Sequence, residues 1–413
     1  MHILWIKTEL LHPVDKGGRI RTYQMLRALA RHHEITYLTL DDGSAAPDAP
    51  VRAAEYCAHL DVVPFAPAPK GSVSFLADVA RNLFSSRPFV IDRYHVPALE
   101  ARLRTLCAER AVDVVVCDFL APSSNVPDSL GVPVILFEHN VESMIWQRHA
   151  EVATNPLKKA YFNSQWRRMR RFEAAECRRM HSVIAVSEQD ANVFRADFGV
   201  ERVHAVATGV DLEYFTERPA GAAITPGSMV FTGSMDWMPN EDGMEWFVAS
   251  VLPQIRAAHP HATLTVVGRN PTSRVRALHA PASGVTVTGS VPDVRPYLES
   301  AELFIVPLRV GGGTRLKIYE GMAMGLPTVS TTIGAEGLPL TDGEHIVLAD
   351  DAQAFARACI AMLANTERAA AVGQSGARYV RGHCGWDGVA RDFAQFCRAA
   401  VPAPLNPQTV MKV

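Results

Sequence analysis

The sequence lacks the features that mark several specialised classes of protein. No uninterrupted apolar run reaches the ~18 residues that a membrane-spanning helix requires. Its 41 basic and 43 acidic residues leave a net charge of −2, whereas a dedicated nucleic-acid-binding protein carries a strong basic excess. The seven cysteines include no CxxC pair, which fits free thiols in a reducing compartment better than a disulfide framework or a zinc site. The apolar stretch at residues 1–10 is too short and is interrupted by charged residues too soon for a secretory signal. We therefore expect a cytoplasmic protein without a nucleic-acid partner.

Short catalytic motifs are also missing. The sequence has no HExxH and no His pair at helical spacing near a carboxylate, so we predict no metal site. It has no GxSxG, and no cysteine has an obvious catalytic partner, which argues against a covalent nucleophile. Without a GxGxxG fingerprint, a dehydrogenase is the least favoured enzyme class.

What the sequence does contain is a repeated alternation of short apolar runs and longer helical patterns. Such alternation predicts parallel sheets with helices on both faces, an α/β fold. The expected strands are 2–6, 35–40, 60–64, 113–117, 134–137, 183–186, 229–231, 262–267, 285–288, 303–306 and 327–330. A length of 413 residues exceeds one usual core, and the pattern pauses at the Pro- and Gly-containing segment 217–228. We therefore predict two doubly wound domains that face each other across a cleft, joined near residues 200–225.

The most informative segment is 306–338, in which an apolar strand runs into Gly311, Gly312, Gly313 and Thr314. Glycines between a strand and a helix let backbone N–H groups approach an anion, and the helix N-terminus adds partial positive charge. The helix that follows carries Arg315, Lys317 and Glu320, and a carboxylate at this last position could accept hydrogen bonds from sugar hydroxyls. The segment predicts a site for a phosphorylated sugar or nucleotide, the alternative being a tight βα turn without a ligand.

Two segments of the first half are candidates for the same site. Gly17 and Gly18 precede a helix and suit a phosphate or a sugar, or else close a plain turn. Glu138, His139 and Asn140 directly follow a buried strand, at the strand end where ligands of such folds bind. His139 could hydrogen-bond a sugar hydroxyl, and the competing interpretation is a structural histidine.

Several of these motifs occur in the order found in a known family. The chain resembles the family-four-like retaining glycosyltransferases of GT-B architecture, particularly those of bacterial polysaccharide assembly. The resemblance rests on GGxIR (17–21), EHN (138–140), AVS (185–187), TGVDxxYF (208–215), FTGSMDWMPN (231–240), VVGRNP (266–271) and GGGTRLKIYEGMAMGLP (311–327). It implies two Rossmann-like domains, an acceptor-side domain at 1–205 and a nucleotide-sugar domain at 206–384. It also implies that residues 385–413 hold a helix returning to the first domain, followed by a frayed tail.

The resemblance assigns roles to individual residues. Glu320 resembles the carboxylate that holds the donor ribose, His139 the histidine close to the transferred sugar, and Gly18 the glycine near the diphosphate. The loop 290–293 resembles the edge that binds the base. The predicted catalytic residues are therefore His139, Arg315 and Lys317, and the predicted donor-binding residues are Gly17, Gly18, Gly233, Arg269, Val291, Gly312, Gly313, Thr314 and Glu320.

Three positions depart from the family pattern. Gly312 stands where the family often has a Glu near the sugar, and Ser234 and Asn240 stand where it often has an Arg and a Lys. Because a leaving diphosphate needs positive charge aimed at it, we hypothesise that Arg315 and Lys317 replace the missing pair, together with Arg269. Solvent exposure without a ligand is the alternative for Arg315.

The function expected is transfer of a sugar from a nucleoside-diphosphate sugar, the only co-substrate, with retention and without a metal or other cofactor. The acceptor would be a glycan, a lipid-linked molecule or a small molecule in exopolysaccharide, lipopolysaccharide or other glycoconjugate synthesis. The alternatives are a non-catalytic GT-B homologue that binds partners in a polysaccharide-assembly complex, and a nucleotide-sugar epimerase. The sequence names neither the base, nor the sugar, nor the acceptor.

One further segment suggests a membrane partner. Residues 155–172 hold six basic residues and no acidic one, with Phe162, Trp166 and Met169 on one helical face. A basic amphipathic helix of this kind can lie on anionic lipid, on the inner face of the membrane. The competing interpretation is an aromatic stripe packed in the core with a solvated basic side.

Overall fold

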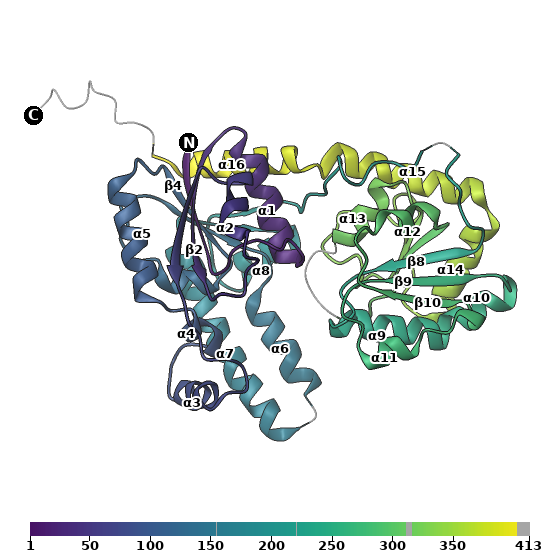
Figure 1. Ribbon diagram of the computed structural model, residues 1–413, viewed down its shortest axis with the longest axis horizontal. Coiled ribbons are helices and arrows are strands. Elements are labelled where there is room, and N and C mark those ends of the chain that lie inside the picture. The colour runs from purple at the N-terminus through teal and green to yellow at the C-terminus, as the bar shows by residue number, and fades with distance from the viewer. Residues whose placement is uncertain (154, 220, 311–315, 403–413) are drawn as a thin grey trace, which may run out of the picture. The chain divides into compact units, whose positions relative to one another are not determined.

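The computed structural model describes residues 1–153, 155–219, 221–310 and 316–402. These divide into two compact units, residues 1–207 with 389–402 (unit 1) and residues 208–310 with 316–388 (unit 2). Each unit contains one sheet whose described strands are all parallel, with helices on both faces (Figure 1). The predicted α/β fold with two doubly wound sheets is therefore confirmed.

The sheet of unit 1 has seven described strands in the order β3-β2-β1-β4-β5-β6-β7. Their bounds are β1 His2–Lys7, β2 Glu34–Asp41, β3 His59–Pro64, β4 Val114–Asp118, β5 Val134–Glu138, β6 Ser182–Ala185 and β7 Val203–Ala205. The helices of this unit are α1 Gly17–Ala30, α2 Ala49–Arg52, α3 Val73–Asn82, α4 Phe89–Arg93, α5 Pro97–Glu109, α6 Glu142–Val152, α7 Pro156–Arg179 and α8 Glu188–Ala196.

The sheet of unit 2 has six described strands in the order β10-β9-β8-β11-β12-β13. They are β8 Ser228–Thr232, β9 Thr263–Val267, β10 Val285–Gly289, β11 Leu303–Val306, β12 Thr328–Ser330 and β13 Val347–Leu348. The helices are α9 Met238–Trp246, α10 Leu252–Ala258, α11 Ser273–Ala277, α12 Arg295–Ser300, α13 Leu316–Ala323, α14 Ala352–Ala364 and α15 Thr366–His383.

Chain order reverses at one place in each sheet, and this reversal positions the candidate sites. In unit 1 it lies between β1 and β4, which are aligned with Ile6 opposite Cys117. In unit 2 it lies between β8 and β11. Helices that connect the strands leave on opposite faces at such a point, so a crevice opens beyond the carboxyl ends of the two strands. The residues that follow β1, β4, β8 and β11 are therefore the first to inspect for chemistry.

The last helix, α16 Trp386–Ala400, begins in unit 2 and contributes most of its length to unit 1. Phe393 is fully buried there, with its ring 5.5 Å from that of Trp5 and 5.0 Å from that of Phe137 (centroid to centroid). The end of the chain thus completes the core of the unit that the start of the chain begins.

The segment 217–228, which the sequence predicts to be a linker, belongs to unit 2. Arg218 donates a hydrogen bond of 2.7 Å to the carbonyl of Ala301, and the Gly227 N–H donates one of 2.6 Å to Glu302. The linker prediction is wrong because small residues and Pro mark irregular backbone, whether or not that backbone packs on a domain.

Helices α6 and α7 lie side by side and extend from the sheet of unit 1 (Figure 1). The aromatic stripe predicted to face lipid instead packs inward: Met169 is fully buried, and the Phe162 ring lies 6.2 Å from Trp146 and 5.7 Å from His149 on α6. The expectation that Met169 and Phe162 face lipid is therefore wrong. The described part of the chain contains no helix long and apolar enough to span a bilayer.

Candidate functional site

Asp118 is the centre of a buried polar cluster at the reversal point of unit 1. It ends β4, and Lys7 ends the neighbouring strand β1. Asp118 Oδ2 accepts three hydrogen bonds: one of 2.9 Å from the Lys7 ammonium (Nζ), one of 2.6 Å from the Thr22 hydroxyl and one of 3.0 Å from the Trp5 indole N–H. Burial alone would raise the pKa of Asp118, but the charge of Lys7 and the nearby His139 hold it well below its usual range. The cluster therefore contains a buried ion pair.

His139 belongs to this cluster, on the first residue after β5. Its Nε2 lies 2.7 Å from Asp118 Oδ1, and its ring stacks on Phe119 with centroids 3.9 Å apart. Only 1% of the side chain is exposed, and burial lowers its pKa to about 3, so the imidazole is neutral at pH 7. His139, predicted to lie close to the transferred sugar, is thus a member of this polar cluster, and Phe119 covers one face of its ring.

Phe119 connects the cluster to the glycine turn before α1. Its φ is +72°, a left-handed conformation that a bulky side chain rarely adopts. The ring lies 4.1 Å from Lys7 Nζ, and a Cβ on Gly18 would sit 3.0 Å from it. A side chain at position 18 would therefore crowd the Phe119 ring, whereas a Cβ on Gly17 would meet nothing within 4 Å. Strained backbone held this way is frequent at functional sites.

Three carboxyl groups lie behind His139. Glu173 accepts hydrogen bonds of 2.6 and 3.0 Å from the backbone N–H groups of Glu142 and Ser143, so a residue of α7 caps the start of α6. Burial raises the pKa of Glu173 to about 8 and that of Glu142 to about 7. Burial, and then the charges of Glu173 and Glu142, also raise the pKa of Glu138 far above its usual range. Glu138 is therefore a buried acid next to His139 in the chain, and its surroundings favour the protonated form.

A small pocket opens over this cluster. It has a volume of about 190 Å³, and its lining includes Lys7, Glu9, Phe119, Glu142 and Met169. Lys7 supplies a cation and Glu142 a carboxyl at its wall, so the pocket offers both kinds of partner to a polar ligand. A sugar hydroxyl can accept a hydrogen bond from an ammonium and donate one to a carboxylate.

Lys317 and Gly233 form the centre of the candidate site in unit 2, beyond the end of β8. Lys317 lies in the first turn of α13, and its ammonium donates 3.0 Å to Asn240 Oδ1 and lies 4.0 Å from the centroid of the Phe231 ring. A Cβ on Gly233 would be 2.6 Å from the Lys317 Nζ. A side chain at position 233 would therefore force the Lys317 ammonium or the Asn240 amide to move.

Asn240 occupies one of the two positions where the family often has a cation. It is 2% exposed, and its amide donates 2.7 Å to the carbonyl of Ser234 while its oxygen accepts from Lys317. The Asn240 side chain thus orients a lysine that comes from a different helix. The basic charge at this strand end is retained, but it originates 77 residues further along the chain.

Glu320 follows Lys317 by three residues on α13, so the two side chains lie on the same side of the helix. Burial raises the pKa of Glu320 to about 7, and the charge of Lys317 opposes that rise. The carboxyl group is half-buried, which leaves it accessible to a ligand. A ribose hydroxyl donating to it would favour the ionised form.

The loop predicted to bind the base carries a network that the sequence analysis missed. Tyr214 donates 2.9 Å to Asp293, and the guanidinium carbon of Arg295 lies 3.9 Å from the centre of the Tyr214 ring. Hydrogen bonding from Arg295 lowers the pKa of Asp293 to about 2. Val291 of this loop is half-buried, as is Arg269, which was predicted to contact the diphosphate. Tyr214 lies in the TGVDxxYF motif, so the motif could be recognised in the sequence, but its hydrogen-bond partner Asp293 could not.

Four predicted site residues, Gly312, Gly313, Thr314 and Arg315, lie outside the described residues. Among the residues that are described, no group of three or more His, Cys, Asp or Glu side chains could hold a metal ion.

Comparison with known proteins identifies the family of both halves. Residues 16–214 match the family described as Glycosyltransferase Family 4, and residues 226–365 match Glycosyl transferases group 1.

Solved structures show the same fold over nearly the whole chain. A sucrose-phosphate synthase from Thermosynechococcus elongatus superposes with a TM-score of 0.69 at 18% identity, over 97% of this chain and 98% of that one. HepE of Anabaena, solved in complex with UDP and glucose, superposes with a TM-score of 0.65 at 14% identity, over 97% and 100%.

Curated relatives match over shorter stretches. A phosphatidyl-myo-inositol mannosyltransferase of Mycobacterium leprae is 28% identical over 42% of this chain and 48% of its own length. An uncharacterised 44.6 kDa protein in the cps region of Klebsiella pneumoniae is 28% identical over 32% of this chain and 35% of its own length. The chain thus aligns with half or less of these two relatives. The two family matches and the shared fold together lead to one conclusion: the chain belongs to the family-four-like glycosyltransferases of GT-B architecture.

Proposed function

We propose that the protein transfers a sugar from a nucleoside-diphosphate sugar to an acceptor, with retention of configuration and without a metal ion. The observation that carries the proposal is the arrangement of Lys317, Gly233 and Glu320 beyond the end of β8. An ammonium oriented by Asn240 is suited to a diphosphate, and a half-buried carboxyl one helical turn away is suited to a ribose. UDP in the complex of HepE supports a uridine nucleotide as the first candidate donor.

Each predicted donor residue has a part in this proposal. Lys317 neutralises the charge that develops on the leaving diphosphate, the contribution expected to lower the barrier most. Arg315 and Arg269 add positive charge, while Gly312, Gly313 and Thr314 offer backbone N–H groups to the phosphates. Val291 and the Tyr214–Asp293 pair border the base. The departing phosphate accepts the proton of the acceptor hydroxyl, which attacks on the same face of the sugar.

Unit 1 supplies the acceptor side in this proposal. The pocket lined by Lys7, Phe119 and Glu142 is suited to a hydroxyl-rich molecule such as a glycan. Gly17, where a Cβ would meet nothing within 4 Å, is the residue at the start of α1 suited to approach by the donor, and the first turn holds no acidic residue and no side-chain cap. Gly18 provides the space that the Phe119 ring occupies. His139 acts from behind Phe119, by fixing Asp118 and Lys7. We place the reaction in the assembly of a polysaccharide or another glycoconjugate, on the cytoplasmic side of the membrane.

Nucleotide binding provides the direct test. The free energy of unfolding should rise by about 2.7 kcal/mol in a nucleoside diphosphate present at about 100 times its dissociation constant. UDP, GDP, ADP and NAD would be compared by thermal shift on wild type, Lys317→Met and Glu320→Ala. Arg276→Met, an exposed residue of α11 in the same unit, is the matched control.

We expect a shift with one nucleoside diphosphate that both site variants lose and the control retains. The nucleotide that shifts would then be tested as its sugar conjugate for release of the diphosphate. If no nucleotide shifted the wild-type protein, the site would not be a donor site, and a non-catalytic binding role in an assembly complex would be favoured.

A further inference from the structure

Helix α3 and the turn after it expose an unusual amount of apolar surface. Val73 is 85% exposed, Leu76 61%, Leu83 52% and Phe84 94%. Single exposed apolar side chains are common on folded proteins, but four within one helix and its C-terminal turn form a patch. The patch is part of unit 1 and lies outside the polar cluster around Asp118.

The patch adjoins α7. Arg168 of α7 donates hydrogen bonds of 2.6 Å to the carbonyl of Asn82 and 3.0 Å to that of Leu83. Gln165, one turn earlier on α7, donates 3.1 Å to the Asn82 side chain and is fully buried. The end of α3 is thus anchored on the middle of α7, and the exposed Leu83 and Phe84 follow directly after this anchor.

The surface formed by residues 70–87 and 155–172, which we call the α3–α7 surface, is strongly basic. These two segments hold nine basic residues and one acidic residue, Asp78. Asp78 already pairs with Arg81 at 3.0 Å. Five of the cations within residues 155–172 are exposed: Lys158, Lys159, Arg167, Arg170 and Arg171. Leu157, at the start of the same helix, is 82% exposed and adds an apolar side chain to the basic side.

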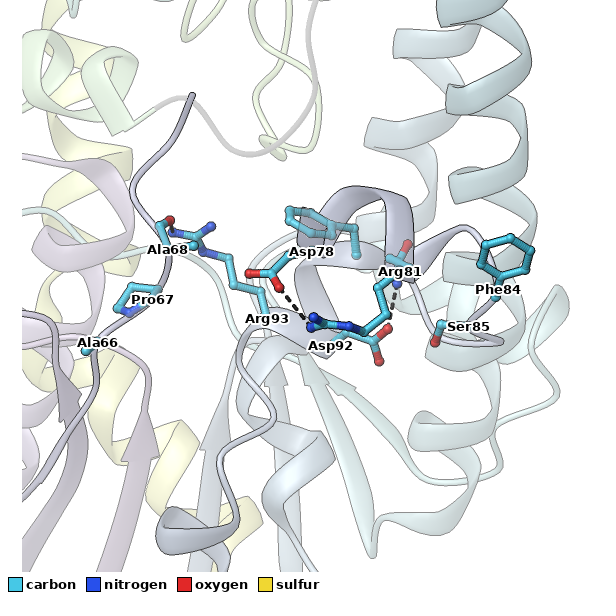
Figure 2. A pocket seen from close by; sticks show the side chains of 11 residues that line it. Ala66, Pro67, Ala68, Asp78, Arg81, Phe84, Ser85, Asp92 and Arg93 are labelled. Atoms are coloured by element: carbon cyan, nitrogen blue, oxygen red, sulfur yellow. Dashed lines mark hydrogen bonds and ion pairs between the residues drawn. The ribbon is translucent and has the colours of Figure 1, made fainter. Parts of the chain in front are cut away.

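A polar pocket opens beside the patch (Figure 2). It has a volume of about 630 Å³, and its wall includes Arg81, Arg93, Asp92, Ser85 and the Phe84 ring. Figure 2 shows Arg93 beside Ala68, whose carbonyl it contacts at 3.1 Å, on the side of the pocket opposite Phe84. Apolar side chains therefore stand at the rim of a pocket whose walls carry hydrogen-bonding groups.

We infer that the α3–α7 surface binds the surface of an anionic lipid bilayer, with Leu76, Leu83 and Phe84 entering the headgroup region. Interfacial helices combine Lys- and Arg-rich sides with Leu and Phe in this manner. A second protein molecule fits less well, because charged residues are depleted at the cores of protein interfaces. The residues involved are not the inward-packed aromatic stripe of α7, and the inference does not rest on the proposed transfer reaction.

The test is co-sedimentation of the full-length protein with vesicles. Vesicles of phosphatidylcholine alone would be compared with vesicles that also contain phosphatidylglycerol, at low and high salt. The apolar variant is Leu76→Ser with Phe84→Ser, and its control is Val51→Ser, a 79% exposed residue of α2. The charge variant is Lys158→Gln with Lys159→Gln, and its control is Arg276→Gln in unit 2.

We expect binding to the anionic vesicles that salt weakens, and far weaker binding to phosphatidylcholine. The apolar variant should lose roughly tenfold or more in partition coefficient, and the charge variant about fivefold for each lysine removed. Both controls should bind like wild type. Equal binding to both kinds of vesicle, or unchanged binding of the apolar variant, would refute the inference. The inference would also be refuted if the wild-type protein and the other variants were dimers and the apolar variant alone were a monomer, because a second copy would then cover the patch.

Discussion

Glu320 makes a prediction that can be tested without substrate. Burial raises its pKa from the ordinary value of 4.5 to about 7, with the charge of Lys317 opposing the rise. Between these two values the folded protein binds more protons at this group than the unfolded chain does. The free energy of unfolding therefore falls as the pH rises through this window. Glutamine has nearly the same shape but no proton to lose, so Glu320→Gln should escape this fall.

The size of the effect follows from the two pKa values. Integration of the linkage relation between pH 5.5 and pH 8 gives about 2 kcal/mol for a shift from 4.5 to about 7. The stability of Glu320→Gln relative to wild type should increase by that amount between these pH values. For a unit of this size the corresponding change in Tm is about 4–8 °C.

Differential scanning calorimetry at the two pH values, on the transition that unfolds unit 2, measures this change. Glu299→Gln, on α12 of the same unit, controls for the removal of a carboxyl charge elsewhere. A relative stability of Glu320→Gln that did not depend on pH would mean that Glu320 is not destabilised by burial. If the prediction holds and Glu320→Gln also loses nucleotide binding, then the ionised Glu320 carboxylate lowers the stability of the fold but is needed to bind the nucleotide.

Three further substitutions probe the two sites. Asp118→Asn strands the buried ammonium of β1 and should cost about 3–5 kcal/mol in urea unfolding, whereas Asn at the 97% exposed Asp128 should cost nothing measurable. Gly233→Ala should displace the donor-site lysine and weaken UDP binding in calorimetric titration, while Gly382→Ala, where a Cβ meets open space, should bind normally. Phe119 has a φ of +72°, so Phe119→Gly should be about 1 kcal/mol more stable than Phe119→Ala in urea unfolding. Equal free energies of unfolding for the two variants would show that the backbone at this position is not strained.

The sequence predicted the layout of both sheets because buried parallel strands are continuous apolar runs. All eleven predicted strands overlap described ones, with ends displaced by at most one residue. Strands β7 and β13 were missed, because edge strands of three and two residues are too short to produce a pattern. The segment 217–228 shows the opposite error, since a composition typical of a linker also occurs in backbone that packs on a domain.

The candidate site was predictable where its members are close in sequence. Helical spacing was enough to place Lys317 and Glu320 together. The ring of donors around Asp118 was not predictable, because Thr22 and Lys7 reach it from 96 and 111 residues away. The left-handed backbone of Phe119 was likewise hidden, since left-handed turns are expected at Gly or Asn and not at Phe.

The contribution of α16 to unit 1 sets an order for folding during synthesis. Unit 2 is one continuous stretch, from Thr208 to Gly388, and can complete its core as soon as that stretch has left the ribosome. Residues 1–207 of unit 1 precede this stretch, yet the Phe393 side chain that packs beside Trp5 is synthesised only after the whole of unit 2. The core of unit 1 is therefore completed after that of unit 2, although most of unit 1 is synthesised before it.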